Sequence, residues 1–353
     1  MKEKILLTGE ANIRYETGFY TTARRPKQIG LTAVIKSDST LCFLAPEKWK
    51  TQILEQVPEQ AQNLTTYGNS PELFLKALGD CLEEGGLDTL WIEYDKIDLK
   101  TYLYLKERFA NAEFQDITRK MEQRRLVKTR EEIAGIRHAA SVAVLAMEQA
   151  KKVIRPGLSE LELAAELEYV MRKAGSDGVP FTMKALSGEN TETVTRVPGN
   201  RKLQRGDFVL LDFGAICDGY SSDWTRTFVI GEASPQQKEL HDLVWKMERG
   251  CIEMIRPGIP MADLVHKAEE ISSQHPFGKY YNPHLGHSIG ITSHEWPTIE
   301  PGVTGVLQEN MVITIEPGVY VPGLGGVRIE DEILVTKDGY EVLTGLSKED
   351  YIV

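Results

Sequence analysis

Residues 209–228 read VLLDFGAICDGYSSDWTRTF, two apolar strands joined by a turn, and residues 312–332, VITIEPGVYVPGLGGVRIEDE, repeat the pattern around a glycine-rich turn. Each of these hairpins carries two carboxylates within otherwise apolar strands. A carboxylate buried in a β-rich core is costly unless an opposite charge compensates it. Four carboxylates at matched positions therefore predict a bound cation. The four are Asp212 and Asp223 in the first hairpin, and Glu316 and Glu330 in the second.

The composition is that of a globular protein with more than one domain. The chain has 353 residues, 41% of them hydrophobic and 26% charged, and two domains are expected at this length. The net charge of -11 argues against nucleic acid as a partner, because phosphate binding needs a clustered basic face. No apolar run reaches about 18 residues, and the N-terminal apolar segment is too short for a signal peptide. We therefore expect a cytoplasmic protein with no membrane partner.

The cysteines indicate no structural role. Cys42, Cys81, Cys217 and Cys251 are scattered and contain no CxxC pair, so the sequence predicts neither a disulfide framework nor a thiolate metal site. Any metal ion is therefore expected to bind oxygen and imidazole.

The first 120 residues alternate strand and helix patterns. Strands are predicted over residues 31–36, 40–45 and 88–94, and helices over 71–86 and 98–110. This alternation predicts an α/β domain with a mixed sheet. The apolar periodicity then gives way to the charged sequence MEQRRLVKTREE, where we place a domain boundary between residues 122 and 123.

The remainder of the chain contains an internal repeat. A long amphipathic helix leads to Ile154-Arg155-Pro156-Gly157 and a second helix, and another helix leads to Ile255-Arg256-Pro257-Gly258 and again to a helix. The second turn lies 101 residues after the first, and about the same offset carries Asp212 to Glu316. Recurrence of helix, turn, helix, strand and carboxylate hairpin in one order predicts a duplication. The two halves should pack as pseudo-symmetric partners, with both hairpins over a shared cleft.

One histidine is well placed to complete a metal site. His287 lies in PHLGHSIGITSHEWP, where Gly286 and Gly290 let the backbone approach closely, and His294 follows seven residues on. Manganese, cobalt and zinc ions accept both carboxylate oxygen and imidazole. Five ligands exceed what one tetrahedral ion needs. We therefore expect a pair of ions about 3.5–4 Å apart, bridged by carboxylates and by a water or hydroxide.

Five short blocks, in this order, resemble the metal-binding blocks of the pita-bread metallopeptidases, the group of Xaa-Pro dipeptidases (prolidases), aminopeptidase P and methionine aminopeptidases. The blocks are LDFGA, SDWTRT, GHSIGITSHE, EPGVY and VRIEDE. The opening ANIRYETGFY is similar to the start of the creatinase-type N-terminal domain found in the first two. The resemblance implies an α+β protein, in which a creatinase-like α/β domain (residues 1–122) precedes a pseudo-symmetric pita-bread catalytic domain (residues 123–353).

The resemblance also implies the metal ligands and their roles. Asp212 and Asp223 would bind one ion, His287 and Glu316 would complete the other, and Asp223 and Glu330 would bridge the two. A hydroxide shared by the ions would attack the scissile carbonyl, while Glu316 handles the proton of the water.

Three further residues have counterparts around the metals of the family. His294 is similar to the catalytic histidine that steadies the tetrahedral intermediate. Arg328 resembles the arginine that holds a ligand carboxylate, and Tyr320, in EPGVY, is expected beside the site.

Two positions depart from the family pattern. Prolidases and aminopeptidase P carry a substrate-contacting histidine where this chain has Thr195, eleven residues before Gly206-Asp207. A second histidine is usual four residues before the metal-binding one, where this chain has Pro283, with His284 one residue later. These departures predict retained metal chemistry with altered or weakened recognition of the substrate. The expected substrate-binding residues are His284, Thr195, Arg328 and Tyr320.

The leading hypothesis is a dinuclear metal-dependent exopeptidase that cleaves the Xaa-Pro bond of dipeptides or short peptides. The alternatives are a non-peptide C–N amidohydrolase resembling creatinase or ectoine hydrolase, a peptidase of non-proline specificity, and a binding module that has lost catalysis. The intact ligand set weighs against the binding module and against creatinase, which works without metal. Methionine aminopeptidases generally lack the first domain. By the same resemblance we expect a homodimer that uses two divalent ions (Mn, Co or Zn) per subunit.

Overall fold

The computed structural model of the chain describes residues 2–21, 32–37, 40–345, 347 and 350–353. Residues Met1–Arg125 form one compact unit and Leu126–Val353 form a second. The boundary expected between residues 122 and 123 lies inside helix α5 (Thr118–Leu126), so the charged segment at this point is helical. None of the described helices is long and apolar enough to cross a bilayer.

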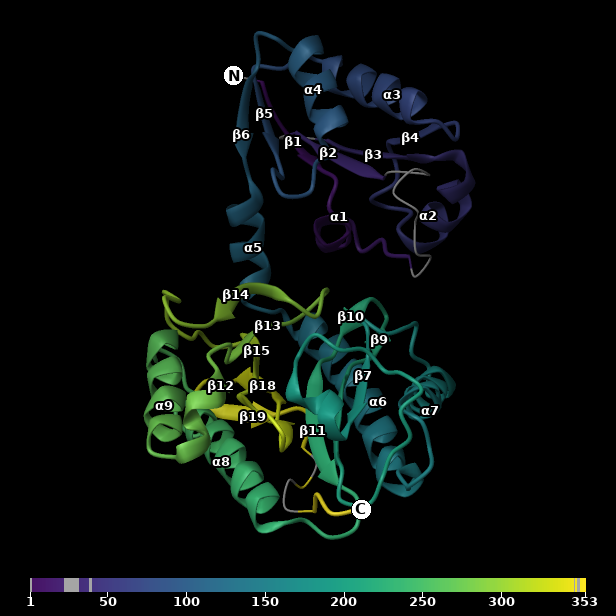
Figure 1. Cartoon of the computed structure of the whole chain (residues 1–353). Coiled ribbons are helices and arrows are strands. Elements are labelled where there is room, and N and C mark those ends of the chain that lie inside the picture. Colours follow the sequence, from purple (N-terminus) through teal and green to yellow (C-terminus); the bar gives the residue numbers. More distant parts are fainter. Residues whose placement is uncertain (1, 22–31, 38–39, 346, 348–349) are drawn as a thin grey trace. The chain divides into compact units, whose positions relative to one another are not determined.

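The first unit is built around a mixed six-stranded sheet (Figure 1). Its strands are β1 (Glu3–Leu7), β2 (Ala33–Lys36), β3 (Leu41–Pro46), β4 (Leu64–Tyr67), β5 (Thr89–Ile92) and β6 (Glu113–Asp116). The order in the sheet is β4-β3-β2-β1-β5-β6. β1, β2 and β3 pair antiparallel, whereas β4, β5 and β6 each pair parallel with a neighbour. The expected strands correspond to β2, β3 and β5, and Leu31, expected in the first of them, lies outside the described residues.

Side chains alternate across this sheet and form a core on each face. Leu6 and Ile35 point into a cluster with α3 and α4, whereas Leu7 and Val34 point into a cluster with α1 and α2. Ser70 caps α3 by accepting a hydrogen bond from the Leu73 amide. The helices are α1 (Glu10–Thr17), α2 (Lys50–Gln56) with the short 3-10 turn η1 (Glu47–Trp49) before it, α3 (Pro71–Glu83) and α4 (Leu99–Arg108).

The second unit contains two helix pairs that follow the predicted repeat: α6 (Arg130–Val153) with α7 (Glu160–Lys173), and α8 (Pro235–Ile252) with α9 (Met261–Ser273). Capping boxes at Thr129, Ser159 and Ser234 start α6, α7 and α8. The turns between the paired helices make equivalent hydrogen bonds: the Gly157 amide donates to the Leu203 carbonyl at 2.8 Å, and the Gly258 amide to the Leu307 carbonyl at 2.8 Å. The two halves therefore share local geometry as well as element order.

The strands of each half form an outer and an inner antiparallel pair. The outer pairs are β8 (Phe208–Phe213) with β11 (Trp224–Val229), and β15 (Val312–Ile315) with β18 (Asp331–Val335). The inner pairs are β9 (Ile216–Cys217) with β10 (Tyr220–Ser221), and β16 (Gly318–Val321) with β17 (Gly325–Arg328). At the tip of the first inner pair, Asp218 and Gly219 both have positive φ, as a type I′ turn requires. Each predicted acidic hairpin thus consists of two nested strand pairs.

The remaining elements extend these sheets. β7 (Lys184–Ser187) joins β8, β12 (Tyr281–Asn282) joins β16, and β14 (Glu295–Ile299), β13 (Gly286–Ser288) and β19 (Tyr340–Val342) join β15 and β18 in a five-stranded sheet. Two 3-10 turns, η2 (Gly188–Glu192) and η3 (Pro276–Tyr280), complete the unit.

A buried arginine joins the two halves. Arg226 on β11 donates to the Glu330 carbonyl at 2.7 Å and to Asp331 Oδ1 at 2.6 Å, and the Glu330 amide donates to the Thr225 carbonyl at 3.1 Å. Both charged side chains of the Arg226–Asp331 pair are almost fully shielded from water. The guanidinium therefore compensates a buried carboxylate next to a predicted metal ligand.

Replacing Arg226 by methionine should destabilise the second unit by about 3–5 kcal/mol, because Asp331 would be left buried with its cation removed. Thermal unfolding followed by circular dichroism measures the loss as a lower Tm. The matched control is Arg249→Met, since Arg249 forms an exposed i,i+4 pair with Glu253 and its removal should change stability by only about 0.5 kcal/mol. Equal Tm values for the two variants would contradict the role given to Arg226.

Candidate metal centre

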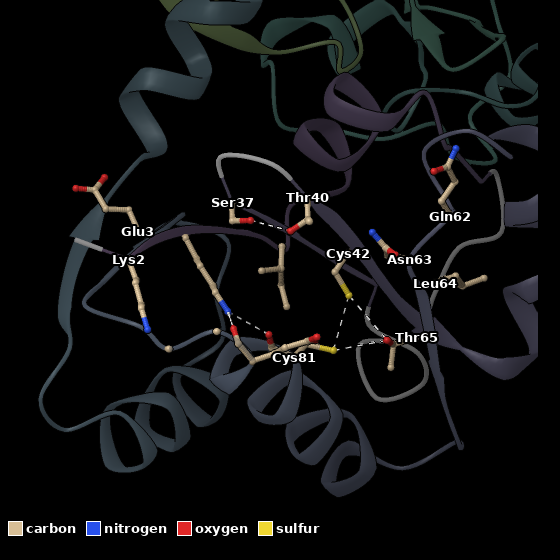
Figure 2. A pocket seen from close by; sticks show the side chains of 15 residues that line it. Lys2, Glu3, Ser37, Thr40, Cys42, Gln62, Asn63, Leu64, Thr65 and Cys81 are labelled. Atoms are coloured by element: carbon tan, nitrogen blue, oxygen red, sulfur yellow. Dashed lines mark hydrogen bonds between the residues drawn. The ribbon is translucent and has the colours of Figure 1, made fainter.

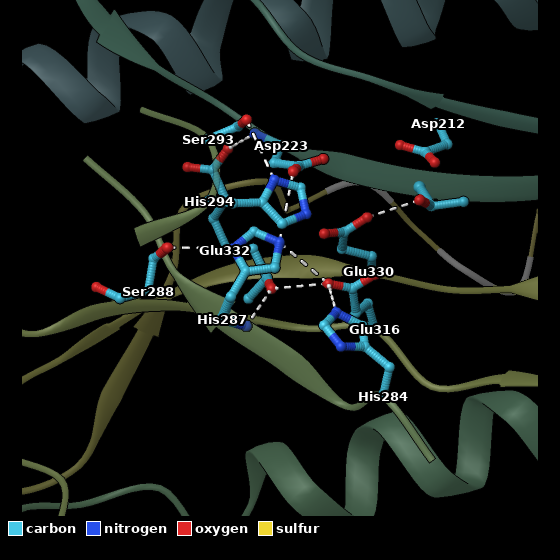
Figure 3. Close-up of polar contacts among 12 residues, drawn as sticks. Asp212, Asp223, His284, His287, Ser288, Ser293, His294, Glu316, Glu330 and Glu332 are labelled. Atoms are coloured by element: carbon cyan, nitrogen blue, oxygen red, sulfur yellow. Dashed lines mark hydrogen bonds and ion pairs between the residues drawn. The ribbon is translucent and has the colours of Figure 1, made fainter. Parts of the chain in front are cut away.

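Carboxylates from both halves meet at one point in the second unit (Figure 3). Asp212 is the penultimate residue of β8, Asp223 directly precedes β11 and Glu330 directly precedes β18, so each lies where an outer strand meets an inner pair. One oxygen of each carboxylate lies within 4.8 Å of the other two, and all three side chains are buried. Thr225 Oγ1 donates to Glu330 Oε2 at 2.6 Å and so fixes that carboxylate.

A second donor group adjoins the first and contains two imidazoles. His284 Nε2 lies 3.2 Å from Glu316 Oε1, and His287 Nε2 lies 3.1 Å from the same oxygen. His287 Nδ1 lies 3.1 Å from the carbonyl oxygen of Ser288. Because a carbonyl can only accept, Nδ1 carries a proton and Nε2 is the nitrogen that faces the carboxylates.

Local backbone features orient the His287 side chain toward the carboxylates. The pairing of β13 with β14 shifts register between His287 and Ser288, and such bulges redirect a side chain. A Cβ on Gly286 would lie 2.1 Å from the carbonyl oxygen of Thr314, so only glycine lets β13 approach β15 this closely. Thr314 Oγ1 in turn accepts from the His287 amide and donates to Glu316.

Asp223 and His294 connect the two donor groups. Asp223 Oδ2 lies 3.6 Å from His287 Nε2, and one donor atom each of Asp223, His287 and His294 falls within 4.8 Å of the others. The rings of His287 and His294 stack with centroids 3.8 Å apart. Partial burial and the neighbouring His287 lower the pKa of His294 to about 4, although the residue keeps an exposed face.

The carboxylates of the centre repel one another. Burial, and then the charges of Glu330 and Asp212, raise the pKa of Asp223 well above its ordinary value. Burial and the charges of Glu316 and Asp212 do the same to the pKa of Glu330. Glu316 differs, because its contacts with His284 and His287 outweigh its burial and hold its pKa well below the ordinary range.

Two positively charged side chains, those of Arg328 and Lys184, contact the same carboxylate, Asp212. Arg328 donates to Asp212 Oδ2, and Lys184 Nζ donates to the same oxygen at 3.2 Å. Arg328 also donates to Tyr320 Oη at 2.9 Å and to Thr225 Oγ1 at 3.2 Å. The guanidinium is thus held between a predicted ligand and a tyrosine of EPGVY, and its buried donors are committed to protein partners.

The donor set fits divalent metal ions. Glu330 Oε1 is buried with no hydrogen-bond partner among the described residues, and the buried His287 Nε2 faces the oxygens of Glu316 and Asp223 without a hydrogen bond of good geometry. Leaving such atoms unsatisfied is costly, as is a cluster of buried like charges. A divalent cation would satisfy both atoms and offset the repulsion, and oxygen ligands with one imidazole suit manganese, cobalt or zinc.

Thr195 behaves differently from the other predicted residues. Its side chain is exposed, and its hydroxyl lies 3.1 Å from Thr193 Oγ1. It belongs to none of the three groups of metal-ligating residues found in the described part of the chain. The structure therefore brings together Asp212, Asp223, His284, His287, His294, Glu316, Tyr320, Arg328 and Glu330, whereas Thr195 has its hydrogen bonds with Thr193 in its own loop.

Several residues of the centre were not predicted. Glu332, fully buried, accepts a hydrogen bond from the Asp223 amide at 2.6 Å, and burial raises its pKa well above the ordinary value. Its signal was present in VRIEDE, since Glu332 follows Glu330 by two residues and lies on the same face of the strand. Lys184 reaches Asp212 because the two are directly opposite across β7 and β8, which no local pattern reveals.

A buried ion pair supports the segment that carries His294. Lys128 Nζ lies 3.1 Å from Glu295 Oε2 and 3.2 Å from Ser288 Oγ, with both charged side chains almost fully shielded from water. Glu295 Oε1 accepts from the amides of Ile291 and Thr292 at 3.1 and 3.4 Å. The pair therefore holds both ends of the loop between His287 and His294.

Comparison with known proteins gives matches over the whole chain. The sequence model of Metallopeptidase family M24 matches residues 134–337, and that of the Creatinase/Prolidase N-terminal domain matches residues 3–127. The Bacillus subtilis protein YkvY is 35% identical over 347 residues, covering 96% of this chain and 92% of its own.

Solved structures agree with the sequence matches. An Xaa-Pro dipeptidase from Bacillus anthracis superimposes with a TM-score of 0.90 at 33% identity, covering 100% of this chain and 95% of that one. A prolidase from Pyrococcus horikoshii gives a TM-score of 0.90 at 30% identity over 99% of this chain and 95% of that one. These findings confirm the predicted resemblance and fold: a creatinase-type N-terminal domain followed by a pita-bread catalytic domain.

The Asp223→Asn substitution should raise the Tm of the metal-free protein and should reduce the gain in Tm that metal gives. Because folding raises the pKa of Asp223, the contribution of this residue to the stability of the metal-free protein is fully present below the ordinary carboxyl pKa and is lost as pH rises through the raised value. Without metal at a pH of about 7.5, where ordinary carboxyls are ionised, the variant should therefore melt higher than the wild type. With manganese added, the wild type should gain Tm and the variant should gain little.

The control for this experiment is Asp218→Asn, the same chemical change at an exposed turn position. Its stability should stay within about 0.5 kcal/mol of the wild type under both conditions. A lower Tm for metal-free Asp223→Asn, or an equal gain with manganese, would show that Asp223 is not a repelled metal ligand.

Proposed function

The chain belongs to metallopeptidase family M24, and on that premise we propose that it is a two-metal exopeptidase that hydrolyses the Xaa-Pro bond of dipeptides or short peptides. The observation that carries the proposal is the convergence of buried carboxylates and imidazoles from both halves into adjoining donor groups. The Xaa-Pro specificity is supported by the solved relatives, which are named as an Xaa-Pro dipeptidase and a prolidase and align over nearly the whole chain.

The metal ions would be held by the five predicted ligands. When bound, they would supply an activated water as nucleophile and polarise the scissile carbonyl. Asp223 is the ligand best placed to serve both ions, because it contributes to a donor group with Asp212 and Glu330 and to another with His287. Manganese, cobalt and zinc remain equivalent candidates on ligand chemistry.

Glu316 is suited to take a proton from the attacking water. Its contacts with the two histidines keep it ionised, and an ionised carboxylate can accept a proton. The hydrogen bond to Glu316 raises the pKa of His284, so His284 can hold the carboxylate as an imidazolium or return a proton to the leaving group.

His294 is suited to bind the oxygen of the scissile carbonyl. Its Nδ1 lies 3.2 Å from Ser293 Oγ, and a hydroxyl proton donated there leaves Nε2 as the protonated nitrogen. The ring stacks on His287 and keeps an exposed face, so a substrate beside the metal ligands can reach it. A neutral imidazole that donates from Nε2 can stabilise developing negative charge on the carbonyl oxygen.

Two residues, Thr195 and His284, bear on the recognition of proline. Thr195 stands where the family resemblance leads us to expect a histidine, and its exposed hydroxyl lies 3.1 Å from Thr193 Oγ1. His284, displaced by one residue from the usual position, contacts Glu316 and also lies 3.9 Å from Glu300. A small-metabolite amidohydrolase therefore remains the second candidate, favoured by this substitution. A homodimer and a cytoplasmic location also remain proposals.

Substrate class can be tested with the manganese-loaded protein. Xaa-Pro dipeptides should be cleaved faster than Xaa-Pro tripeptides, non-proline dipeptides, creatine and ectoine, as measured by chromatography of the hydrolysis products of each substrate. Chelation of the metal, or the Asp223→Asn substitution, should lower kcat by about 10²-fold or more. Hydrolysis of a small metabolite with no turnover of any proline peptide would replace the proposal with the second candidate.

His294→Ala should lower kcat about 10²–10³-fold on the best substrate and change KM little, because its proposed hydrogen bond strengthens in the transition state. His138→Ala is the matched control, since His138 lies on the exposed side of α6. Bound metal should be counted in both variants. A His294→Ala enzyme with full metal content and wild-type kcat would remove His294 from the mechanism.

A further inference from the structure

Two cysteines that are far apart in sequence meet in the first unit. Cys42 lies on β3 and Cys81 on α3, and their Sγ atoms are 3.8 Å apart. Thr65 on β4 completes a triangle, with its Oγ1 3.9 Å from Cys42 Sγ and 3.7 Å from Cys81 Sγ (Figure 2). The sequence showed no cysteine motif, and the two thiols meet because α3 packs against β3.

Small molecules can reach this pair. Both cysteines are half-buried and line a cavity of about 650 Å³ in the first unit. The cavity is also lined by polar side chains, among them Ser37, Thr40 and Gln62. A pocket of this size accommodates a peroxide or a small thiol compound.

The surroundings favour a thiolate on Cys81. Its hydrogen bond with Cys42 lowers the pKa of Cys81 to about 6, against the opposing effect of burial, and raises the pKa of Cys42. Lys4 Nζ donates to the carbonyls of Cys81, Leu82 and Glu84 at 3.3, 2.8 and 2.6 Å, so an ammonium caps the end of α3 beside the thiol. A partly exposed cysteine with a lowered pKa is typical of a reactive thiol.

The other two cysteines provide an internal contrast. Cys217 and Cys251 are buried, and burial raises their pKa values to about 11 and about 12. Neither has a second thiol beside it among the described residues. They should therefore be inert toward the same reagents.

We propose that Cys42 and Cys81 form a redox-active dithiol that is converted to an intramolecular disulfide by two-electron thiol oxidants, either small hydroperoxides or low-molecular-weight disulfides. A metal ion is a poorer occupant, because none of the metal-ligating groups found among the described residues includes either thiol. Disulfide formation requires the two sulfurs to approach by roughly 1.8 Å, to the S–S distance of about 2.05 Å. The site lies apart from the metal ligands in sequence and belongs to the first unit.

With a hydroperoxide, the Cys81 thiolate attacks one oxygen and the O–O bond breaks. The other oxygen leaves as hydroxide or alkoxide and takes up a proton, and Cys81 becomes a sulfenic acid. Cys42 then attacks that sulfur, the S–S bond forms, and the hydroxyl leaves with the Cys42 proton as water. The two cysteines lose two electrons and the hydroperoxide gains them. With a small disulfide, Cys81 forms a mixed disulfide and releases one thiol, and attack by Cys42 releases the second.

The test uses the reduced, full-length protein, exposed to hydrogen peroxide in one arm and to oxidised glutathione in the other. Free thiols are then alkylated and the chain is digested for mass spectrometry. The number of free cysteines should fall from four to two, with Cys42 and Cys81 in one cross-linked peptide pair and Cys217 and Cys251 alkylated only after denaturation. Dithiothreitol should restore all four. The arm that gives the faster cross-link identifies the class of oxidant.

Two variants test the order of the steps. Cys42→Ser should accumulate a sulfenic acid on Cys81, trapped by a 1,3-dione reagent, whereas Cys81→Ser should leave Cys42 reduced under the same conditions. Thermal melts of both variants check that they are folded. The proposal is overturned if Cys42 and Cys81 of the native wild type stay reduced with both oxidants, so that both are fully alkylated, or if they form a disulfide only after unfolding. These measurements do not depend on peptidase activity, so their result is independent of whether the proposed function is correct.

Discussion

Mutual repulsion of buried carboxylates is the constraint around which the second unit is organised. Asp212, Asp223, Glu330 and Glu332 lie close together out of water, and only Asp212 is directly paired with protein cations. Burial and like charge raise the pKa of Asp223 and Glu330, so the protein alone disfavours the ionised cluster. A bound divalent cation would offset this repulsion, and metal binding and folding would then be thermodynamically linked.

The duplicated architecture explains how such a cluster can be built at all. Each half delivers its ligands at the junction between an outer and an inner strand pair, a position fixed by two sets of antiparallel hydrogen bonds. The halves are then joined through the Thr225–Glu330 bridge and through Arg226, which bonds the backbone and a side chain of the opposite half. The hydrogen-bonded strands therefore hold the carboxylates close together despite their mutual repulsion.

The fold and the repeat could be predicted from the sequence, and so could the residues that the structure gathers into the donor groups, because these rest on local patterns and on motifs in order. Edge strands were missed: β4 and β6 are short and mostly half-exposed, so they lack the apolar alternation that identifies a strand. Residues brought in by tertiary register were missed as well. Lys184 reaches Asp212 across two paired strands, and Lys128 reaches Glu295 over 167 positions of chain. Cys42 and Cys81 meet for the same reason, through packing of a helix on a sheet.

The three histidines of the centre all come from the second half, on β13 and the segments beside it, while the predicted metal ligands of the first half, Asp212 and Asp223, are carboxylates (Figure 3). A nearly two-fold scaffold therefore holds a site with two unlike ends, acidic on one side and imidazole-bearing on the other. A peptide also has two unlike ends. Because the two halves supply different ligands, the two ends of the centre differ chemically. A peptide bound there would therefore have one favoured orientation instead of two equivalent ones.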